Sequence, residues 1–69
     1  MKDVSSSMAP RTLRRVHGQS QVVAAGRLGI SVSTVRIYEI DPCAVADRPR
    51  RLLNAYYADL RATWEARAA

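Results

Sequence analysis

Apolar residues recur along this chain at intervals of three and four, which is the period of amphipathic α-helices. Glycine, proline and serine signals divide the pattern into four segments. The first segment begins near Ser7, tolerates Pro10 in its first turn, directs Leu13 and Val16 inward and ends around Gly18. No strand-like alternation or internal repeat is found. The pattern therefore predicts an all-α, compact four-helix domain, possibly with a fifth helix.

The second and third segments are separated by a short break at Gly29. Ser20 is the predicted N-cap of the second helix, and Ser31 is the predicted N-cap of the third. The third helix must end before Asp41, because a residue that precedes proline is pushed out of the helical region. Ala25 is small enough to let two crossing helices come close, and Gly29 permits a sharp turn with positive φ. Residues 21–40 thus have the pattern of a helix-turn-helix.

The last segment is the longest. A loop over residues 41–48 precedes it, and Asp47 and Pro49 are start signals for a helix that would be about 28 Å long if it reaches Arg67. Its apolar side chains follow spacings of four, three and four, at Leu53, Tyr57, Leu60 and Trp64. Residues 1–7 are polar and Ser-rich and are predicted to form a flexible tail. Residues 8–69 form the single domain.

Charge narrows the class of partner. The chain has 69 residues and net charge +5, with 11 basic against 6 acidic residues, and Lys2 is its only lysine. Arginine favours planar, bidentate contacts to phosphate and guanine, so a polyanion is the expected partner. No apolar run approaches the roughly 20 residues of a membrane span, and Cys43 is the only cysteine. We therefore expect no membrane association and a cytoplasmic, nucleoid-associated location.

Residues 20–39 follow the pattern T/S-Q-x-x-x-A-x-x-L-G-V/I-S-x-x-T-I/V-x-x-Y-E closely. In this the chain resembles the phage-repressor/Cro-type (XRE) helix-turn-helix family, whose fold is lambda-repressor-like. The resemblance implies a structural salt bridge between Arg14, late in the first helix, and Glu39, at the end of the third. Val22 and Val23 stand where the family usually has polar residues, which suggests close approach by another surface, either a dimer partner or the last helix.

The outward face of the third helix is the predicted reader of DNA bases, because such helices enter the major groove by their leading turns. Arg36 can bind the O6 and N7 edge of guanine, and Val32 suits a thymine methyl group; Ser33 and Ile37 complete the base-contacting set. Helix N-termini and cations favour phosphate. The predicted phosphate contacts are Gln21, Ser31, Thr34, Arg48, Arg50 and Arg51, with Arg11, Arg15 and Arg27 as further candidates.

Arg48, Arg50 and Arg51 crowd the start of the last helix, where the helix dipole disfavours positive charge, and a bound phosphate would relieve that conflict. His17 is expected to be a helix-end cation or a surface residue, and neither it nor Cys43 has an orienting pattern around it. The chain also lacks a glycine-rich phosphate loop and metal-ligand spacing. The sequence therefore predicts a protein that is not an enzyme and that uses no metal, cofactor or small-molecule ligand.

A single reader of this size touches few bases, so a homodimer with half-sites about 34 Å apart is expected. Tyr57, Leu60 and Trp64 are the predicted dimer interface, although Leu53 and Tyr57 could instead fill the chain's own core. The predicted function is a small dimeric repressor, of the kind used by phages and mobile elements, that reads an inverted repeat in double-stranded DNA.

Two other functions stay open. Residues 34–39 (TVRIYE) are also similar to the T-I-R-x-Y-E helix of mercury-regulator (MerR) and excisionase proteins, which are architectural DNA binders with a wing. The segment over residues 41–51 lacks the strand and glycine signals of such a wing. The other alternative is an antitoxin-like, protein-binding module that uses Val22, Val23 and Trp64.

Overall fold

A computed structural model of the chain describes residues 8–68, so the tail predicted at residues 1–7 lies outside the described part. Four α-helices follow one another: α2 (Pro10–Val16), α3 (Gln21–Leu28), α4 (Val32–Ile40) and α5 (Asp47–Ala68). A 3-10 turn, η1 (Pro42–Ala44), joins α4 to α5, and no strand occurs between residues 8 and 68. The prediction of an all-α four-helix domain is confirmed.

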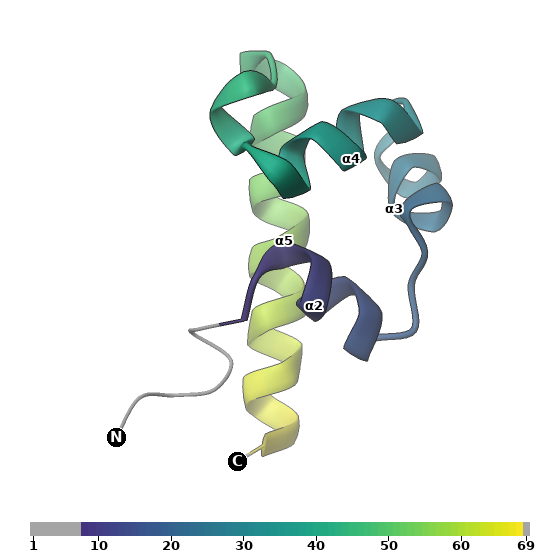
Figure 1. Cartoon of the computed structure of the whole chain (residues 1–69). Coiled ribbons are helices and arrows are strands. Elements are labelled where there is room, and N and C mark those ends of the chain that lie inside the picture. Colours follow the sequence, from purple (N-terminus) through teal and green to yellow (C-terminus); the bar gives the residue numbers. More distant parts are fainter. Residues whose placement is uncertain (1–7, 69) are drawn as a thin grey trace.

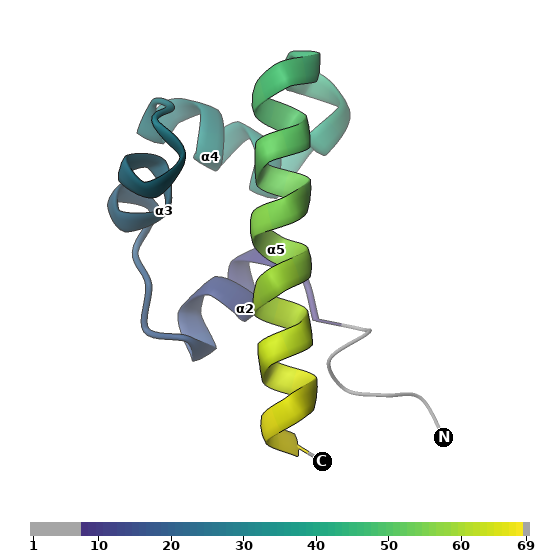
Figure 2. The ribbon, with the colours of Figure 1, turned by 180° about the vertical axis from the view of Figure 1, so that it is seen from behind.

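The long helix α5 forms the axis of the molecule, and the three shorter helices lie along one side of it (Figures 1 and 2). Helix α2 packs across α5, and α3 packs against α4. Helix α4 also contacts α5. The opposite side of α5 is left uncovered by the shorter helices, as the view from behind shows (Figure 2).

Side-chain caps and one glycine set the bounds of α3 and α4. The Ser20 hydroxyl accepts a hydrogen bond from the Val23 amide at 3.1 Å, and the Ser31 hydroxyl accepts one from the Thr34 amide at 3.1 Å. Gly29 has φ of 66°, a left-handed conformation that residues with a Cβ rarely adopt. Both predicted caps and the predicted turn are therefore confirmed.

The end of α2 differs from the prediction. Val16 was expected to point inward, but it is 41% exposed. His17 makes the contact with α5 instead: its Nε2 lies 2.9 Å from the Leu60 carbonyl oxygen, and its ring meets Trp64 edge-on at 6.3 Å. The prediction for Val16 was therefore wrong. His17 lies at the end of α2, as expected, but it is half-buried against α5 and is not a surface residue.

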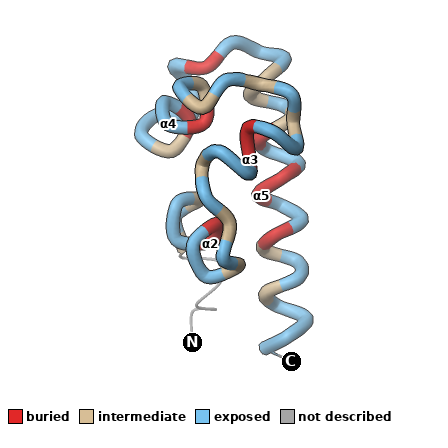
Figure 3. The backbone as a smooth tube through the Cα atoms, turned by 90° about the vertical axis from the view of Figure 1, so that its right-hand side faces the viewer, coloured by how far each residue is buried: buried red, intermediate tan, exposed pale blue. Residues whose placement is uncertain are grey.

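The core lies where α2, α3 and α4 face α5, and Figure 3 shows the buried positions on these inward sides. Leu13, Val35 and Leu53 are completely buried. Ala24 and Ala25 are buried in α3, which fits the close helix approach that the small side chain at position 25 predicted. The remaining buried residues of the core are Tyr38, Val45, Tyr56, Tyr57 and Leu60.

Helix α5 contributes a wider apolar face than the sequence suggested. Tyr57 stacks on Tyr38 with ring centroids 5.4 Å apart, and Tyr56 meets Tyr57 edge-on at 5.0 Å. Tyr57 is 3% exposed and Leu60 is 8% exposed, so these two members of the predicted dimer interface belong to the chain's own core. For Tyr57 this is the alternative that the sequence left open, whereas the burial of Leu60 was not expected. Both residues are buried because α2 and α4 pack on α5 and together cover a broad stripe of it.

The segment after α4 is more ordered than the loop predicted over residues 41–48. Asp41 Oδ1 accepts a hydrogen bond from the Cys43 amide at 3.1 Å and so caps η1. Val45 is 6% exposed and fixes the segment to the core, while α5 begins as early as Asp47. No local pattern in the sequence singles out Val45.

Candidate nucleic-acid interface

Helix α4 has one face in the core and one face in solvent. Val35 and Tyr38 are buried, whereas Ser33, Arg36, Ile37 and Ile40 are exposed. These four residues fall at i, i+3, i+4 and i+7, which places them on a single face of the helix. The structure thus leaves three of the four predicted base-contacting residues uncovered. The fourth, Val32, is half-buried and packs against the core.

The predicted salt bridge between Arg14 and Glu39 is confirmed. Arg14 Nε donates to Glu39 Oε2 at 2.7 Å and Nη2 donates to Oε1 at 3.1 Å, so the guanidinium and the carboxylate pair in a bidentate way. Both side chains are nearly buried, with exposed fractions of 8% and 4%. Nη1 donates to the Gln19 carbonyl oxygen at 2.9 Å, so each nitrogen of the guanidinium has a hydrogen-bond partner.

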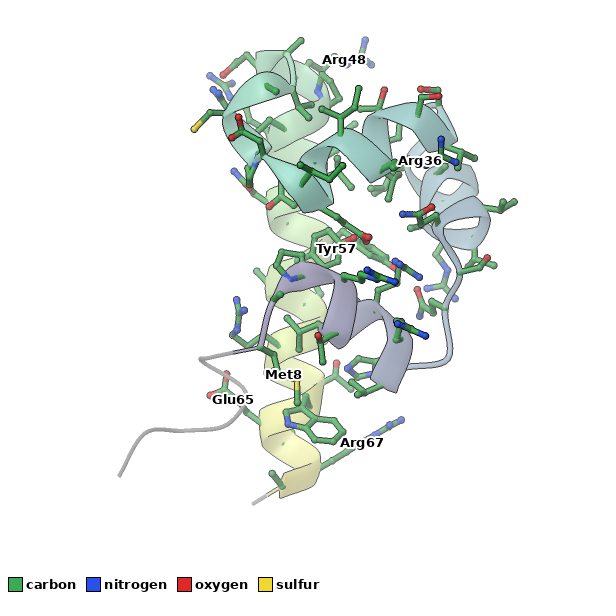
Figure 4. The ribbon with its side chains drawn as sticks, in the orientation of Figure 1. Met8, Arg36, Arg48, Tyr57, Glu65 and Arg67 are labelled. Carbon is green, nitrogen blue, oxygen red and sulfur yellow. The ribbon has the colours of Figure 1, made fainter. Side chains whose placement is uncertain are left out.

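Glu39 is the centre of a network that joins all four helices. Its carboxylate also accepts hydrogen bonds from Gln21 Nε2 at 3.2 Å and from the Tyr57 hydroxyl. Figure 4 shows Tyr57 on α5 at the level between α2 and α4. Burial alone would raise the pKa of Glu39, but the hydrogen bonds from Arg14, Tyr57 and Gln21 outweigh it and hold that pKa below its ordinary value of 4.5. The carboxylate is therefore ionised at neutral pH.

The pKa values of the two titratable partners of Glu39, Arg14 and Tyr57, are both raised. The hydrogen bond of Glu39 with Arg14 raises the pKa of the guanidinium despite burial, so the guanidinium stays charged. Burial first, and then the hydrogen bond to Glu39, raises the pKa of the Tyr57 hydroxyl above its ordinary value of 10.0. The hydroxyl thus stays protonated and keeps donating to the carboxylate.

A cleft of about 400 Å³ opens beside this network, between α2, the start of α3 and α4. We call it the arginine cleft. Its lining residues are Arg11, Arg14, Arg15, Ser20, Gln21, Arg36, Glu39 and Ile40. Because Arg14 and Glu39 neutralise each other, the charge of the cleft comes from the other three arginines.

Arg11, Arg15 and Arg36 form no ion pair with any residue between positions 8 and 68. Arg11 and Arg15 are four residues apart and so share one face of α2. The N-terminus of α3 adds the positive end of a helix dipole to the same cleft. The arrangement favours an anion.

Gln21, a predicted phosphate contact, lies in this cleft at the first residue of α3. Its side-chain nitrogen already donates to Glu39, so part of its hydrogen-bonding capacity serves the network. The side chain can still offer a second amide hydrogen to a ligand.

A second cleft, of about 350 Å³, lies on the other side of α4, where the turn after α3 meets the start of α5. We call it the turn cleft. Exposed Arg48 lines it together with Ser31 and Thr34, whose hydroxyls lie 2.8 Å apart. Figure 4 shows Arg36 on the α3 side of α4 and Arg48 beside the start of α5. Four of the six predicted phosphate contacts are thus divided between two clefts that flank α4: Gln21 lines one, and Ser31, Thr34 and Arg48 line the other.

Arg50 and Arg51 are placed differently from Arg48. Arg50 Nη2 lies 2.9 Å from Asp47 Oδ1, and Arg51 Nη2 lies 3.0 Å from Asp47 Oδ2. The acidic residue sits in the first turn of α5, where it also interacts favourably with the helix dipole. The predicted conflict between these cations and the dipole is therefore largely offset within the chain itself.

The structure adds one residue that was not among the predicted contacts and raises the importance of two others. Ile40 is 80% exposed at the end of α4, and its position three residues after Ile37 was the available signal. Arg11 and Arg15 were only secondary candidates, but they share a cleft with Arg36. The exposed valines at positions 22 and 23 are covered neither by α5 nor by any other described element.

Other chemistries find little support in the described residues. Between positions 8 and 68 there is no group of three or more His, Cys, Asp or Glu side chains that could hold a metal ion. The helices in that range are also too short or too polar to cross a membrane. A scan against protein-family models found no match, and searches of curated proteins and of solved structures found none either. The function must therefore be inferred from the geometry of the site.

Proposed function

We propose that this chain is a sequence-specific DNA-binding regulator, a small dimeric repressor of the phage-repressor/Cro type that its sequence resembles. One observation carries the proposal: the uncovered face of α4 borders a cleft in which Arg11, Arg15 and Arg36 lack ionic partners among the described residues. A surface that joins unpaired arginines to a protruding helix is the combination that reading a DNA groove requires.

The dimensions support this use of α4. Nine helical residues extend over about 13 Å, and the major groove of B-DNA is about 12 Å wide. With α4 in the groove, the arginine cleft and the turn cleft would face the phosphates on its two sides. Arg11 and Arg15 would hold one strand, and Arg48 the other. Such contacts fix the register of the helix on the duplex, and the outer face of α4 then reads the bases.

A second copy of the chain belongs to the proposal, because a helix of this length contacts only a few base pairs. Tyr57 and Leu60 are buried in the chain's own core and so offer little surface to a partner. Trp64 is half-buried and is the one predicted interface residue that retains exposed surface. Dimers that place two α4 helices about 34 Å apart would bind an inverted repeat.

The winged alternative is less well supported. The connection from α4 to α5 consists of the 3-10 turn η1 and residues 41, 45 and 46. None of these residues lies in a strand. The protein-binding alternative has a specific observation in its favour, since Val22 is 65% exposed and Val23 is 43% exposed. The arginines of the arginine cleft argue for a polyanion nonetheless, because an apolar protein surface would leave their charges without compensation.

Selection from a pool of duplexes with a random centre, followed by gel shifts at two salt concentrations, tests the proposal. We expect enrichment of a defined sequence and binding that weakens with salt. Arg36→Ala should bind the selected duplex more weakly than the parent does. Arg67→Ala is the matched control, because Arg67 lies at the far end of α5 (Figure 4) and should leave affinity unchanged. Absence of enrichment together with a flat salt response would overturn the proposal and favour the protein-binding module.

A further inference from the structure

The outer face of α4 is poor in hydrogen-bonding groups. Of its four exposed residues only Ser33 and Arg36 can donate or accept hydrogen bonds, while Ile37 is 44% exposed and Ile40 is 80% exposed. Arg36 also lines the arginine cleft with Arg11 and Arg15, so its charge lies among the groups suited to phosphate. Half of the exposed face is therefore branched aliphatic surface.

The two isoleucines have different surroundings. Ile40 lines the arginine cleft, so a phosphate group held by Arg11, Arg15 and Arg36 would lie beside it. Ile37 lines neither the arginine cleft nor the turn cleft. It lies on the ridge of α4 between the two clefts, which is the part of the helix that would point to the floor of a groove whose walls are phosphates.

One apolar group is characteristic of the floor of the major groove. The C5-methyl group of thymine projects there, whereas the other base edges present hydrogen-bond donors and acceptors. An isoleucine packed against donors and acceptors would remove the water molecules bound to them and could not offer hydrogen bonds in their place. Against a methyl group the same side chain gains buried apolar surface. Ile37 is therefore matched to thymine and mismatched to the polar edges of guanine and cytosine.

The occupant is identified by the combination of charge and apolar surface. Cations flank the ridge on both sides, at the arginine cleft and at Arg48 in the turn cleft. The major groove of duplex DNA has the matching arrangement, with a row of phosphates on each side and thymine methyl groups between them. A purely apolar protein partner would cover the ridge but leave the flanking arginines uncompensated.

We propose that Ile37 is a specificity-determining residue that reads the methyl group of a thymine in the major groove. The inference rests on the proposed function and deepens it, because it states which base the ridge of α4 selects. Ile40, although more exposed, contacts the backbone side and selects no base.

Uracil replacement tests the assignment with a single-group change. A duplex selected by the full chain is remade with deoxyuridine in place of one thymidine at a time, which removes only the methyl group. For the parent chain we expect at least one position at which the loss of the methyl lowers affinity about threefold to fivefold, the range that burial of one methyl implies. In Ile37→Ala this loss should disappear at that position, whereas Ile40→Ala should retain it.

Both isoleucines are exposed, so the variants should melt at the temperature of the parent, which circular dichroism checks. The outcomes distinguish failure of the role of Ile37 from failure of the proposed DNA binding. Salt-sensitive, sequence-selective binding with no uracil effect at any position would overturn the role of Ile37 and leave the proposed function standing. An equal uracil effect in the parent and in Ile37→Ala would also overturn that role. Failure to select any duplex would overturn the proposed function, and this inference with it.

Discussion

The arginine cleft contains the same residue type in two opposite situations. Arg14 is 6% exposed, and its guanidinium is shared between Glu39 and the Gln19 carbonyl oxygen. Arg11, Arg15 and Arg36 are exposed on the same cleft and form no ion pair with the described residues. One arginine thus holds the helices together, and three others face outward with their charge uncompensated.

The difference shows how one cluster can serve both the fold and a ligand. A buried charge is stable only when it is paired and fully hydrogen-bonded, and Arg14 meets that condition. Exposed arginines cost little in the absence of a ligand because water solvates them. The inner pair therefore fixes the shape of the cleft, and the outer arginines are available to an anion.

Removal of Arg14 should have the largest effect. Arg14→Ala leaves Glu39 charged and buried with only Gln21 and Tyr57 as partners, which should lower the free energy of unfolding by about 3 to 5 kcal/mol. Arg11→Ala and Arg15→Ala are matched controls on the same helix and should change it by less than about 0.5 kcal/mol. Urea denaturation measures all three, and equal effects would remove the distinction between inner and outer arginines.

The outer arginines should affect DNA binding while stability stays constant. Each of Arg11→Ala, Arg15→Ala and Arg36→Ala should lower affinity for a selected duplex roughly fivefold near physiological salt, because about one phosphate contact is lost. The slope of log affinity against log salt should become shallower by about 0.9 per substitution. Anisotropy titrations at several salt concentrations give both values. Unchanged slopes in all three variants would place the phosphates elsewhere on the chain.

Acid should act on the inner pair and not on the outer arginines. The pKa of Glu39 is lowered in the folded chain, so its contribution to stability is complete above its ordinary value of 4.5 and is lost as pH falls through the lower folded value. The unfolding free energy of the parent should therefore decrease with falling pH below about 4.5. Glu39→Gln should flatten this dependence, and denaturant titrations across that range provide the check. A steep, unaltered dependence in the variant would assign it to other carboxyl groups.

Arg50 and Arg51 are intermediate between Arg14 and the outer arginines of the cleft. They lie at the surface, as the outer arginines do, but they are paired with Asp47. Asp47→Ala should lower the free energy of unfolding by less than about 1 kcal/mol, since surface ion pairs are weak. If these arginines contact phosphate, removal of their acidic partner should also leave DNA affinity equal or higher. Thermal melts and gel shifts measure the two effects; a loss of affinity with an unchanged melting temperature would show that Asp47 itself takes part in binding.

Local signals were sufficient to predict the elements and the caps that bound them. Ser20, Gly29 and Ser31 act through hydrogen bonds and backbone conformation within a few residues, so their roles are visible in the sequence. The bridge between Arg14 and Glu39 connects distant residues, and it was predicted only through the resemblance to the repressor family.

Features that depend on tertiary packing were not predictable from local patterns. Leu60 is buried in addition to Tyr57 because two helices pack on α5 at once, and no periodicity along α5 shows how many neighbours it has. His17, and not Val16, contacts α5 because α2 ends at Val16, and the exact end of that helix was not visible in the sequence. The arginine cleft unites side chains from α2, α3 and α4, so its existence depends on their arrangement in space.

The proposed DNA-binding face can be tested by titrating the ¹⁵N-labelled chain with a selected duplex and following its amide resonances. We predict that the largest shifts occur at Ser33, Arg36 and Ile37 of α4, together with Arg11 and Arg15. Amides on the uncovered side of α5, such as Ala55 and Asp59, should stay unchanged. Shifts confined to that side of α5, or no shifts at all, would contradict a DNA-binding role for α4 and its neighbouring arginines.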